Sequence, residues 1–297
     1  MNGMNYVESL HENGFAVIKN GFDKSEADEC ILEYTRQIKE WGQHAEVYRK
    51  KNGMMMRLAN FHIINTTLQK AFVNASSLID LCTTFFSGRK PCLYTSLFFN
   101  SGTQQPIHRD SPLFCTYPEN QFLGCWFALE DADANNGALI VNPKCHKLFA
   151  DEFPKRNEML NRFRGRESLL GSIPNPSPRQ STVGFSESEL WVDYQAYVQE
   201  RCADLESETQ VINAEKGDII VWHPLLPHGG SLVQDTSRTR FSCVFHVVPE
   251  GERIYGNNLF FSPHEFRADE SAVKAIDISE RVSMQIHDCA FMVENDD

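Results

Sequence analysis

Three side chains that could share one metal ion come from two distant parts of this chain, and the distance between these parts limits how the chain can fold. His108 and Asp110 stand in the stretch Gln-Pro-Ile-His-Arg-Asp, and His228 stands in Leu-Pro-His-Gly-Gly-Ser, roughly 118 positions later. Alternate residues of a β-strand point to the same side, so a strand would direct both His108 and Asp110 at one ion. The third donor must then arrive from another strand. The pattern therefore predicts a fold that brings two distant strands side by side.

Two neutral imidazoles and one carboxylate are the ligand set of the non-haem iron oxygenases. Such a set holds one face of a ferrous ion and leaves the opposite face open, as oxygen chemistry requires. A His-x-Asp pair alone is weak evidence, because chance produces one in roughly every second chain of this length and composition. The neighbouring sequence has to carry the rest of the argument.

Short apolar runs separated by turn signals surround these motifs. The run 123–129 is aromatic and apolar, and Glu130-Asp-Ala-Asp-Ala-Asn-Asn-Gly137 after it is typical of a tight turn. The turn Lys216-Gly-Asp218 precedes a short apolar run that leads to His228. The predicted strands cover residues 123–129, 138–143, 219–222 and 237–246.

Two other patterns compete with the chosen donors. His223 lies five residues before His228 and is the alternative third ligand, but it falls at the end of a predicted strand. His44-x-Glu46 also has ligand spacing. It follows a polar stretch, Ser25 to Trp41, that predicts a helix, so we interpret it as solvated surface.

A series of motifs extends along most of the chain in a fixed order. It comprises Leu10-His-Glu-Asn-Gly14-Phe-Ala-Val-Ile18, His108-x-Asp110, Trp126-Phe-Ala-Leu129, Asn136-Gly137 with Asn142-Pro-Lys-Cys-His146-Lys, Gly217-Asp218, His228-Gly-Gly and Arg240-x-Ser242. Together these motifs, from about residue 5 to about residue 250, resemble the phytanoyl-CoA dioxygenase family of iron and 2-oxoglutarate enzymes. The resemblance implies a mainly β fold with flanking helices (α+β), built on a double-stranded β-helix, the cupin-like jelly roll.

The resemblance also implies roles for single residues. It makes His108, Asp110 and His228 the Fe(II) ligands. It implies that Arg240 binds the distal carboxylate of the cosubstrate 2-oxoglutarate, because its planar guanidinium can donate two parallel charge-assisted bonds. Ser242, on the same face of the predicted strand, could add a hydroxyl to that carboxylate.

Further positions are assigned less directly. Gln105 and Trp126 stand where relatives often line the cosubstrate. Arg238 shares the predicted strand face of Arg240 and is the alternative carboxylate ligand, while a surface salt bridge is the ordinary role for such an arginine. We prefer Arg240 because of its spacing to His246 and its pairing with Ser242.

The implied reaction consumes O2 and 2-oxoglutarate and oxidises an unactivated C–H bond of a small molecule. Relatives that halogenate have a small residue in place of Asp110, so the carboxylate makes hydroxylation the default. Desaturation or oxidative ring closure, as in natural-product biosynthesis, stays open. The alternatives are a catalytically silent cupin-like binding or regulatory protein, and a metal enzyme that hydrolyses or isomerises. The three donors and the Arg-x-Ser pair argue against both.

The sequence predicts one dioxygenase domain over residues 1–297. Its parts are a helical N-terminal part at about 1–90, a jelly-roll core at about 91–250 and an extension at 251–297. The long interval between Asp110 and His228 predicts an insertion at about 150–210, whose segment 174–184 is a candidate loop or lid because of its proline and serine content. The turn Pro143-Lys-Cys-His146 departs from the family's usual Pro-Gly-Ser-His.

Charge and composition restrict the partners. A formal net charge of −12 argues against nucleic acid, whose binding needs a large cationic footprint. Basic residues gather in and around the insertion, and if they face the iron we expect a small anionic substrate that bears a carboxylate, such as an amino acid or polycarboxylate derivative. These residues are Lys147, Lys155, Arg156, Arg162, Arg164, Arg166 and Arg179, with Phe153, Phe163, Trp191 and Tyr194 among them.

The stretch Met54 to Phe61 could line the pocket, although core packing explains its methionines equally well.

The nine cysteines lack metal-binding CxxC spacing, and the N-terminus lacks an apolar signal segment. We therefore expect a cytoplasmic protein with reduced thiols. No run is long and apolar enough to predict a membrane span, and the polar C-terminus is not a peroxisomal address. The sequence leaves the oligomeric state undetermined.

Overall fold

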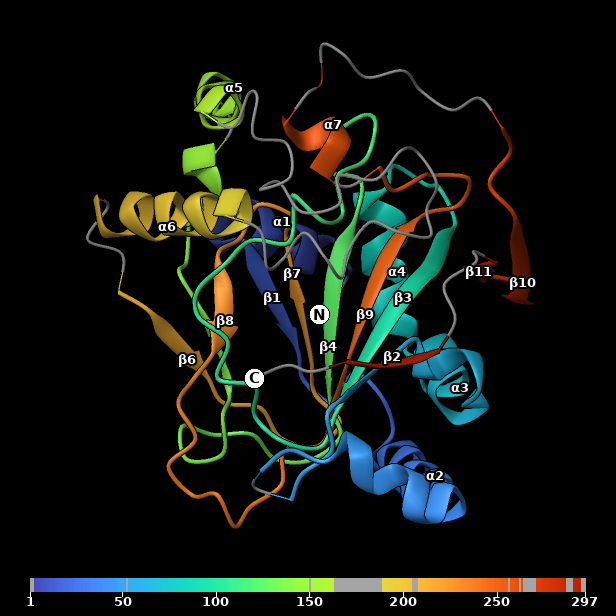
Figure 1. Ribbon diagram of the computed structural model, residues 1–297. Coiled ribbons are helices and arrows are strands. Elements are labelled where there is room, and N and C mark those ends of the chain that lie inside the picture. The colour runs from blue at the N-terminus through green and yellow to red at the C-terminus, as the bar shows by residue number, and fades with distance from the viewer. Residues whose placement is uncertain are drawn as a thin grey trace.

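The computed structural model describes residues 3–51, 53–149, 151–162, 189–204, 208–255, 257–261, 263, 271–286 and 291–294. Two β-sheets face each other, and helices cover the outer face of the larger one (Figure 1). A single apolar cluster joins the inner faces of both sheets, from Trp126 and Val244 on one to Val141 and Ile212 on the other. The jelly-roll architecture expected from the motifs is confirmed.

The major sheet contains nine strands within the described residues. Seven follow one another in the order β1 (Phe15–Ile18), β7 (Ile219–Trp222), β4 (Leu123–Ala128), β9 (Ser242–Pro249), β3 (Pro91–Phe99), β11 (Val282–Gln285) and β10 (Ala275–Ser279). The other two are β2 (Arg57–Ala59), which pairs with β3, and β12 (Met292–Glu294), which pairs with β2. The N-terminal part, expected to be helical, thus also supplies two strands of this sheet.

The minor sheet has the order β6 (Gln210–Ile212), β5 (Leu139–Val141) and β8 (His228–Gly230). Beyond β8 the chain segment around His108 adds one isolated bridge, His108 to His228. Because these two histidines are direct neighbours across this bridge, the minor sheet brings together the two distant motifs.

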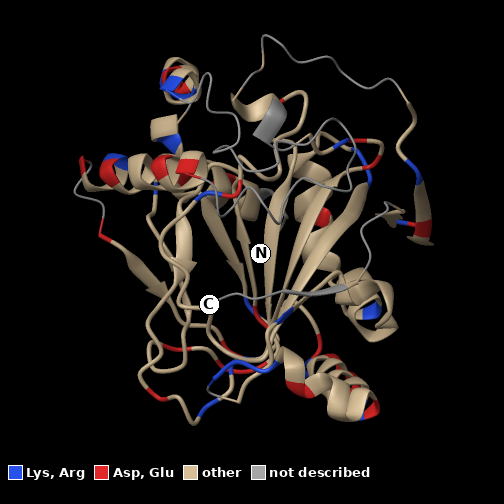
Figure 2. Cartoon of the chain, in the orientation of Figure 1, with Lys and Arg blue, Asp and Glu red and all other residues tan. Residues whose placement is uncertain are grey.

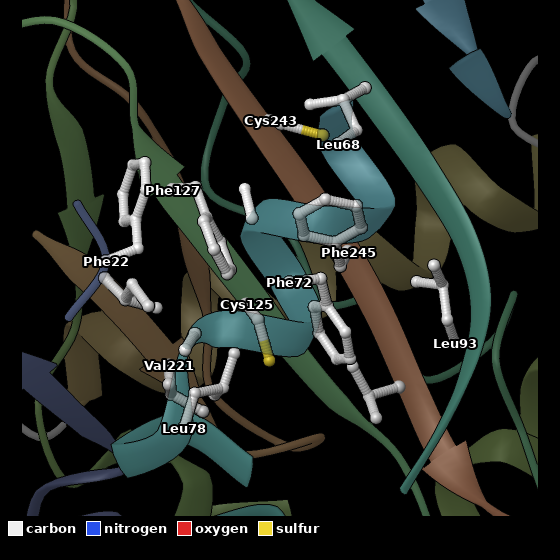
Figure 3. Packing of buried hydrophobic residues seen from close by; sticks show 14 of the residues in the cluster. Phe22, Leu68, Phe72, Leu78, Leu93, Cys125, Phe127, Val221, Cys243 and Phe245 are labelled. Atoms are coloured by element: carbon white, nitrogen blue, oxygen red, sulfur yellow. The ribbon is translucent and has the colours of Figure 1, made fainter. Parts of the chain in front are cut away.

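The helical layer packs on the outer face of the major sheet. It comprises α1 (Gly3–Asn13), α2 (Lys24–Trp41), α3 (Thr66–Asn74) and α4 (Ser76–Phe85). The short 3-10 turns η1 (Gly42–Tyr48) and η2 (Phe61–Ile63) lie between α2 and α3. Phe72 of α3 packs against Phe127 and Phe245 of the sheet, and Leu68 lies beside Cys243 (Figure 3). The predicted polar helix at 25–41 is confirmed by α2, which begins at the N-cap Asp23.

Strand alternation separates the two faces of the sheet. On β9, Cys243, Phe245 and Val247 belong to the outer cluster under the helices, whereas Val244 belongs to the inner one. Residues 242, 244, 246 and 248 of this strand therefore face the interior between the sheets. Ser242 and His246 are both buried there.

The described part of the predicted insertion packs as a separate layer across one end of the sheets (Figure 1). It forms α5 (Phe153–Arg162) and α6 (Glu189–Asp204). Both helices share an apolar cluster with η3 (Cys145–Phe149), which precedes the insertion, and with α7 (Asn257–Phe261). Tyr194 and Val198 of α6 are fully buried in it. Phe163, Arg164, Arg166, Arg179 and the candidate lid 174–184 lie outside the described residues.

Charged residues occur mainly in the outer helices and the loops, while the strands contain few of them (Figure 2). The eight described cysteines are buried thiols without disulfides. Among the described residues, no helix combines the length and the apolar composition needed to cross a bilayer.

The predicted strand 237–246 starts later than expected, at Ser242. Before it, the backbone N–H of Phe241 donates to the Glu130 carboxylate at 2.9 Å, and that of Arg240 donates to the Asn100 carbonyl at 3.1 Å. These bonds replace regular strand pairing. Arg240 thus precedes β9, and no strand face is shared by Arg240, Ser242 and Arg238.

Two imidazoles, of the half-buried His223 and the buried His146, lie close together at the end of β7. The ring centroids of His223 and His146 are 5.1 Å apart, and the His223 Nδ1 accepts the Leu225 N–H at 3.2 Å. Burial, with smaller contributions from His146 and His11, lowers the pKa of His223 from 6.5 to about 3. The folded protein therefore keeps this imidazole neutral where an unfolded chain would protonate it.

Acid should accordingly destabilise the fold through His223. Because its folded pKa lies below the unfolded value, the stabilisation is complete above pH 6.5 and declines as the pH falls toward 3. The loss between pH 7 and pH 5 should be about 2 kcal/mol. His223→Asn, which keeps an acceptor for the Leu225 N–H, should remove this part of the pH dependence in urea unfolding of the metal-free protein. The same substitution at the exposed His44 should leave this pH dependence unchanged. If the free energy of unfolding of His223→Asn varied with pH as in the wild type, His223 would not be its source.

Candidate metal centre

Reciprocal backbone hydrogen bonds place His108 beside His228. The His108 N–H donates to the His228 carbonyl at 2.9 Å, and the His228 N–H donates to the His108 carbonyl at 3.0 Å. Gly229 permits this close approach, because a Cβ there would lie 2.6 Å from the Gln105 carbonyl oxygen. The Gly-Gly after His228 thus lets this strand lie close to the segment that precedes His108.

The side chains of His108, Asp110 and His228 converge on one point. One donor atom from each lies within 4.8 Å of the other two, and all three residues are buried. The His108 Nε2 lies 3.6 Å from Asp110 Oδ1, and the His228 Nε2 lies 3.5 Å from Asp110 Oδ2. Among the described residues, this is the one group of His, Cys, Asp and Glu with metal-binding proximity.

Each imidazole is oriented by its other nitrogen. The His108 Nδ1 lies 2.8 Å from the Pro106 carbonyl oxygen, and the His228 Nδ1 lies 3.0 Å from that of Leu226. A carbonyl only accepts, so each Nδ1 carries the proton and each Nε2 presents its lone pair to the shared point. Both rings have the tautomer that a metal ligand requires.

The expected strand under the His-x-Asp pair does not form, although its two side chains still meet. His108 makes a single bridge, and Asp110 already lies in a bend, where its carbonyl accepts the N–H groups of Leu113 and Phe114. The side chain of Arg109, which lies between them in the sequence, is fully buried. This bend, and not strand alternation, brings the carboxylate to the imidazoles.

Two further residues hold the Asp110 carboxylate and were not foreseen as site residues. The Trp222 Nε1–H donates to Asp110 Oδ2 at 3.2 Å, and the His246 Nε2 lies 3.3 Å from the same oxygen. The His246 ring stacks on Phe114 with centroids 3.8 Å apart. These contacts occupy Oδ2 and leave Oδ1 for a metal. The inward position of His246 on β9 is the signal that could have found it.

A missing side chain on β4 makes room for this arrangement. Gly124 pairs with both Trp222 on β7 and His246 on β9. A Cβ at Gly124 would lie 2.0 Å from the Trp222 ring. The indole can therefore lie over the strand and reach Asp110 only because residue 124 is glycine.

Burial sets the charges of the cluster. It lowers the pKa of His228 from 6.5 to about 4, against the opposing attraction of Asp110. For Asp110, burial favours the neutral acid, but His228 and the contacts with His108 and His246 outweigh it and hold the pKa well below 3.8. At neutral pH the site thus offers a neutral His228 imidazole and an anionic carboxylate, which is the charge state that a divalent cation binds.

The expected cosubstrate residues lie at the opening of β9. Arg240 is buried, and its guanidinium donates to the Ser242 hydroxyl. The Arg240 Cζ lies 5.5 Å from the Trp126 ring centroid and 5.7 Å from that of Phe99. Arg240, Ser242 and Trp126 thus form one cluster at the inner surface. Gln105 is half-buried, and its carbonyl accepts the Gly230 N–H at 2.9 Å.

The competing residues lie elsewhere. Arg238 binds Asp133 through both carboxylate oxygens, at 2.9 and 3.2 Å, and is half-exposed. His223 packs against Phe85, away from the three donors, and His44 is exposed. The described arginines of the insertion also have partners, because Arg156 and Arg162 are in ion pairs with acidic residues.

The family model for phytanoyl-CoA dioxygenase (PhyH) matches residues 10–240. The chain belongs to the phytanoyl-CoA dioxygenase family. Its curated relatives include the peroxisomal phytanoyl-CoA dioxygenases of Mus musculus, 30% identical over 146 residues, and of Homo sapiens, 28% identical over 148 residues. Each alignment covers 48% of this chain and 33% of the relative, so the chain spans about a third of the length of these family members.

Solved structures support the fold of this family member. The epimerase SnoN, crystallised with Fe3+, alpha ketoglutarate and nogalamycin RO, is similar at a TM-score of 0.56 with 14% identity, covering 95% of this chain and 98% of that one. The alpha ketoglutarate dependent carbocyclase SnoK from nogalamycin biosynthesis is similar at a TM-score of 0.54 with 14% identity, covering 91% and 94%. At this identity the likeness concerns the fold alone.

Loss of the indole N–H should weaken metal binding. In Trp222→Phe the Oδ2 atom of Asp110 loses a hydrogen-bond donor, so the carboxylate is less well oriented. We expect an affinity for Co(II), used as a probe for Fe(II) and measured calorimetrically, about tenfold lower than in the wild type. Trp191→Phe, on the half-buried α6 tryptophan, is the matched control and should bind Co(II) like the wild type. Equal affinities in the two variants would contradict the role of Trp222.

Proposed function

We propose that this protein is an Fe(II)- and 2-oxoglutarate-dependent oxygenase that oxidises an unactivated C–H bond of a small molecule. The observation that carries the proposal is the convergence of His108, Asp110 and His228 within 4.8 Å in a buried site. Family membership agrees with it. Two imidazoles and a carboxylate on one side leave the opposite positions of an iron ion open for a cosubstrate and O2.

The donor set fits this metal. Both Nε2 lone pairs are directed at the shared point, and the Asp110 Oδ1 is not occupied by Trp222 or His246. Neutral imidazoles with a single carboxylate leave one net positive charge on a bound divalent ion, which attracts an anionic chelator. Bound iron would supply the redox chemistry that couples O2 to the conversion of 2-oxoglutarate into succinate and CO2.

Arg240 is suited to the far carboxylate of 2-oxoglutarate. It stands just before β9, and His246, four residues along the strand from Ser242, contacts Asp110. Four residues of strand span about 13 Å. An Arg240 side chain lying along the inner face would leave room for a five-carbon diacid between its guanidinium and the metal. Phe99 and Trp126 beside the guanidinium exclude water, which strengthens its attraction for a carboxylate.

The reaction type that we propose rests on the presence of the Asp110 carboxylate. Asp110 occupies the position that a halide would need, so we infer hydroxylation as the default outcome. Desaturation or oxidative ring closure of a natural-product type remains part of the proposal. Positioning of the substrate carbon relative to the metal would select among these outcomes.

The substrate is proposed to be a small metabolite, and its anionic character stays a prediction. Arg156 pairs with Glu119 at 3.2 Å, and Lys155 pairs with Glu158 at 3.0 Å. These cations are therefore already compensated. A screen of small carboxylates, amino-acid conjugates and uncharged metabolites for stimulated succinate formation would identify the class.

The proposal predicts a spectroscopic signature. Anaerobic addition of Fe(II) and 2-oxoglutarate should produce the weak visible charge-transfer band of the chelate. Arg240→Ala should raise the concentration of 2-oxoglutarate needed for the band by about a hundredfold, because a buried charge-assisted pair to the far carboxylate is lost. Arg238→Ala is the matched control, since its partner is Asp133, and should titrate like the wild type.

Other results would reject the proposal. A folded wild-type protein without the band, or one whose band survives His228→Ala, would not be this oxygenase. His223→Ala should keep the band, because His223 lies outside the donor cluster. A band that forms without any turnover over a broad substrate screen would favour the silent binding protein.

A further inference from the structure

Arg109 lies between the two proposed ligands His108 and Asp110, and its side chain is fully buried. The direction of its two peptide groups decides where both neighbouring side chains point. Any group that holds these peptides therefore also holds the ligands. The structure gives both the peptide groups and the guanidinium of Arg109 partners from the insertion.

The Arg109 guanidinium is held by acidic and hydroxyl groups. Its Nη1 lies 2.9 Å from both carboxylate oxygens of Glu152 and also donates to the Tyr194 hydroxyl. Tyr194 in turn donates to Glu152 at 3.0 Å. On the other side, the Nη2 donates to the Ser111 hydroxyl at 3.1 Å, and Ser111 donates to the Pro224 carbonyl at 2.7 Å. The guanidinium also lies 4.2 Å from the centre of the Phe149 ring.

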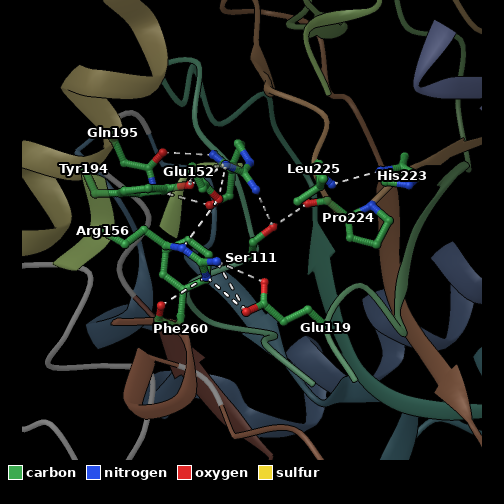
Figure 4. Close-up of polar contacts among 11 residues, drawn as sticks. Ser111, Glu119, Glu152, Arg156, Tyr194, Gln195, His223, Pro224, Leu225 and Phe260 are labelled. Atoms are coloured by element: carbon green, nitrogen blue, oxygen red, sulfur yellow. Dashed lines mark hydrogen bonds and ion pairs between the residues drawn. The ribbon is translucent and has the colours of Figure 1, made fainter. Parts of the chain in front are cut away.

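Helix α6 grips the backbone of the same residue. The Gln195 Oε1 accepts the Arg109 N–H at 2.9 Å, and the Gln195 Nε2 donates to the Arg109 carbonyl at 3.2 Å. One turn further, the Gln199 Nε2 donates to the Ile107 carbonyl at 3.0 Å. The helix therefore fixes peptide groups on both sides of His108. Figure 4 shows Gln195, Tyr194, Glu152 and Ser111 gathered around this segment.

Stability alone is a weak reason for such an arrangement. Buried ion pairs contribute little to folding compared with apolar residues of the same volume, because both charges lose their hydration. The buried Arg109 Nε also has no hydrogen-bond partner among the described residues. What the network does provide is one defined geometry, since each amide and carboxylate bond has a preferred direction.

We propose that α6, through Gln195 and Gln199, and the Arg109–Glu152–Tyr194 cluster are positioning elements of the metal centre. The described part of the insertion, with Glu152 and α6, then serves to set the angle between the His108 and Asp110 side chains. This inference rests on the proposed metal site. It assigns a role to Gln195, Gln199 and Arg109 without any contact between them and the metal.

The test compares two buried residues of α6. Gln195→Met keeps the length of the side chain but removes both bonds to Arg109. Val198→Ala opens the same apolar cluster and leaves those bonds in place. Both should lower the melting temperature. Only Gln195→Met should lower the affinity for Co(II), by about tenfold in calorimetric titration of the metal alone.

Equal Co(II) affinities in Gln195→Met and Val198→Ala would overturn the positioning role. A wild-type protein that binds Co(II) no better than His108→Ala would instead overturn the proposed function, so the two failures are distinguishable. Should Gln195→Met not fold, the exposed Gln199→Ala decides the question. It should reduce the affinity by about threefold relative to the exposed Glu200→Ala, and equal values would reject the inference.

Discussion

The reciprocal backbone bridge between His108 and His228 is the contact on which the rest of the site depends. It joins two motifs that are distant along the chain, and it does so with main-chain groups that any residue possesses. Its geometry is possible because Gly229 leaves space for the Gln105 carbonyl. Once the bridge forms, the two imidazoles must lie near each other, with ring centroids 4.6 Å apart. The remaining residues of the site orient and charge what this bridge has brought together.

A buried carboxylate among apolar strands needs several partners, and Asp110 obtains them from three parts of the fold. Trp222 comes from β7, His246 comes from β9, and the two imidazoles come from the minor sheet. Gly124 lies between Trp222 and His246 in the major sheet and lets the indole cross it. The cost of burying the charge is therefore offset by groups that also fix its direction, which links the folding of the jelly roll to the chemistry of the site.

The contacts of the insertion lead to a different interpretation of this segment than its sequence does. As sequence it is a basic and aromatic stretch that interrupts the family pattern, which suggested a surface facing an anionic substrate. In the structure its described arginines form ion pairs with acidic residues, and α6 contacts the segment of the proposed ligands through neutral glutamines. Glutamines on a helix have no distinctive spacing, so a linear pattern could not reveal that two of them meet the backbone beside His108.

The sequence by itself indicated the class of fold and the three side chains that converge, because the order of its motifs, among them the Gly-Gly after His228, resembles the family along most of the chain. It also indicated Arg240 with Ser242, although it misplaced the start of β9 there. Only the tertiary structure decided that Trp222 and His246 contact the Asp110 carboxylate. It also decided that Arg238 forms an ion pair with Asp133, and that a bend in the backbone brings Asp110 to the site. These outcomes depend on which distant groups satisfy each buried donor and acceptor, and that is settled only when the whole interior is packed.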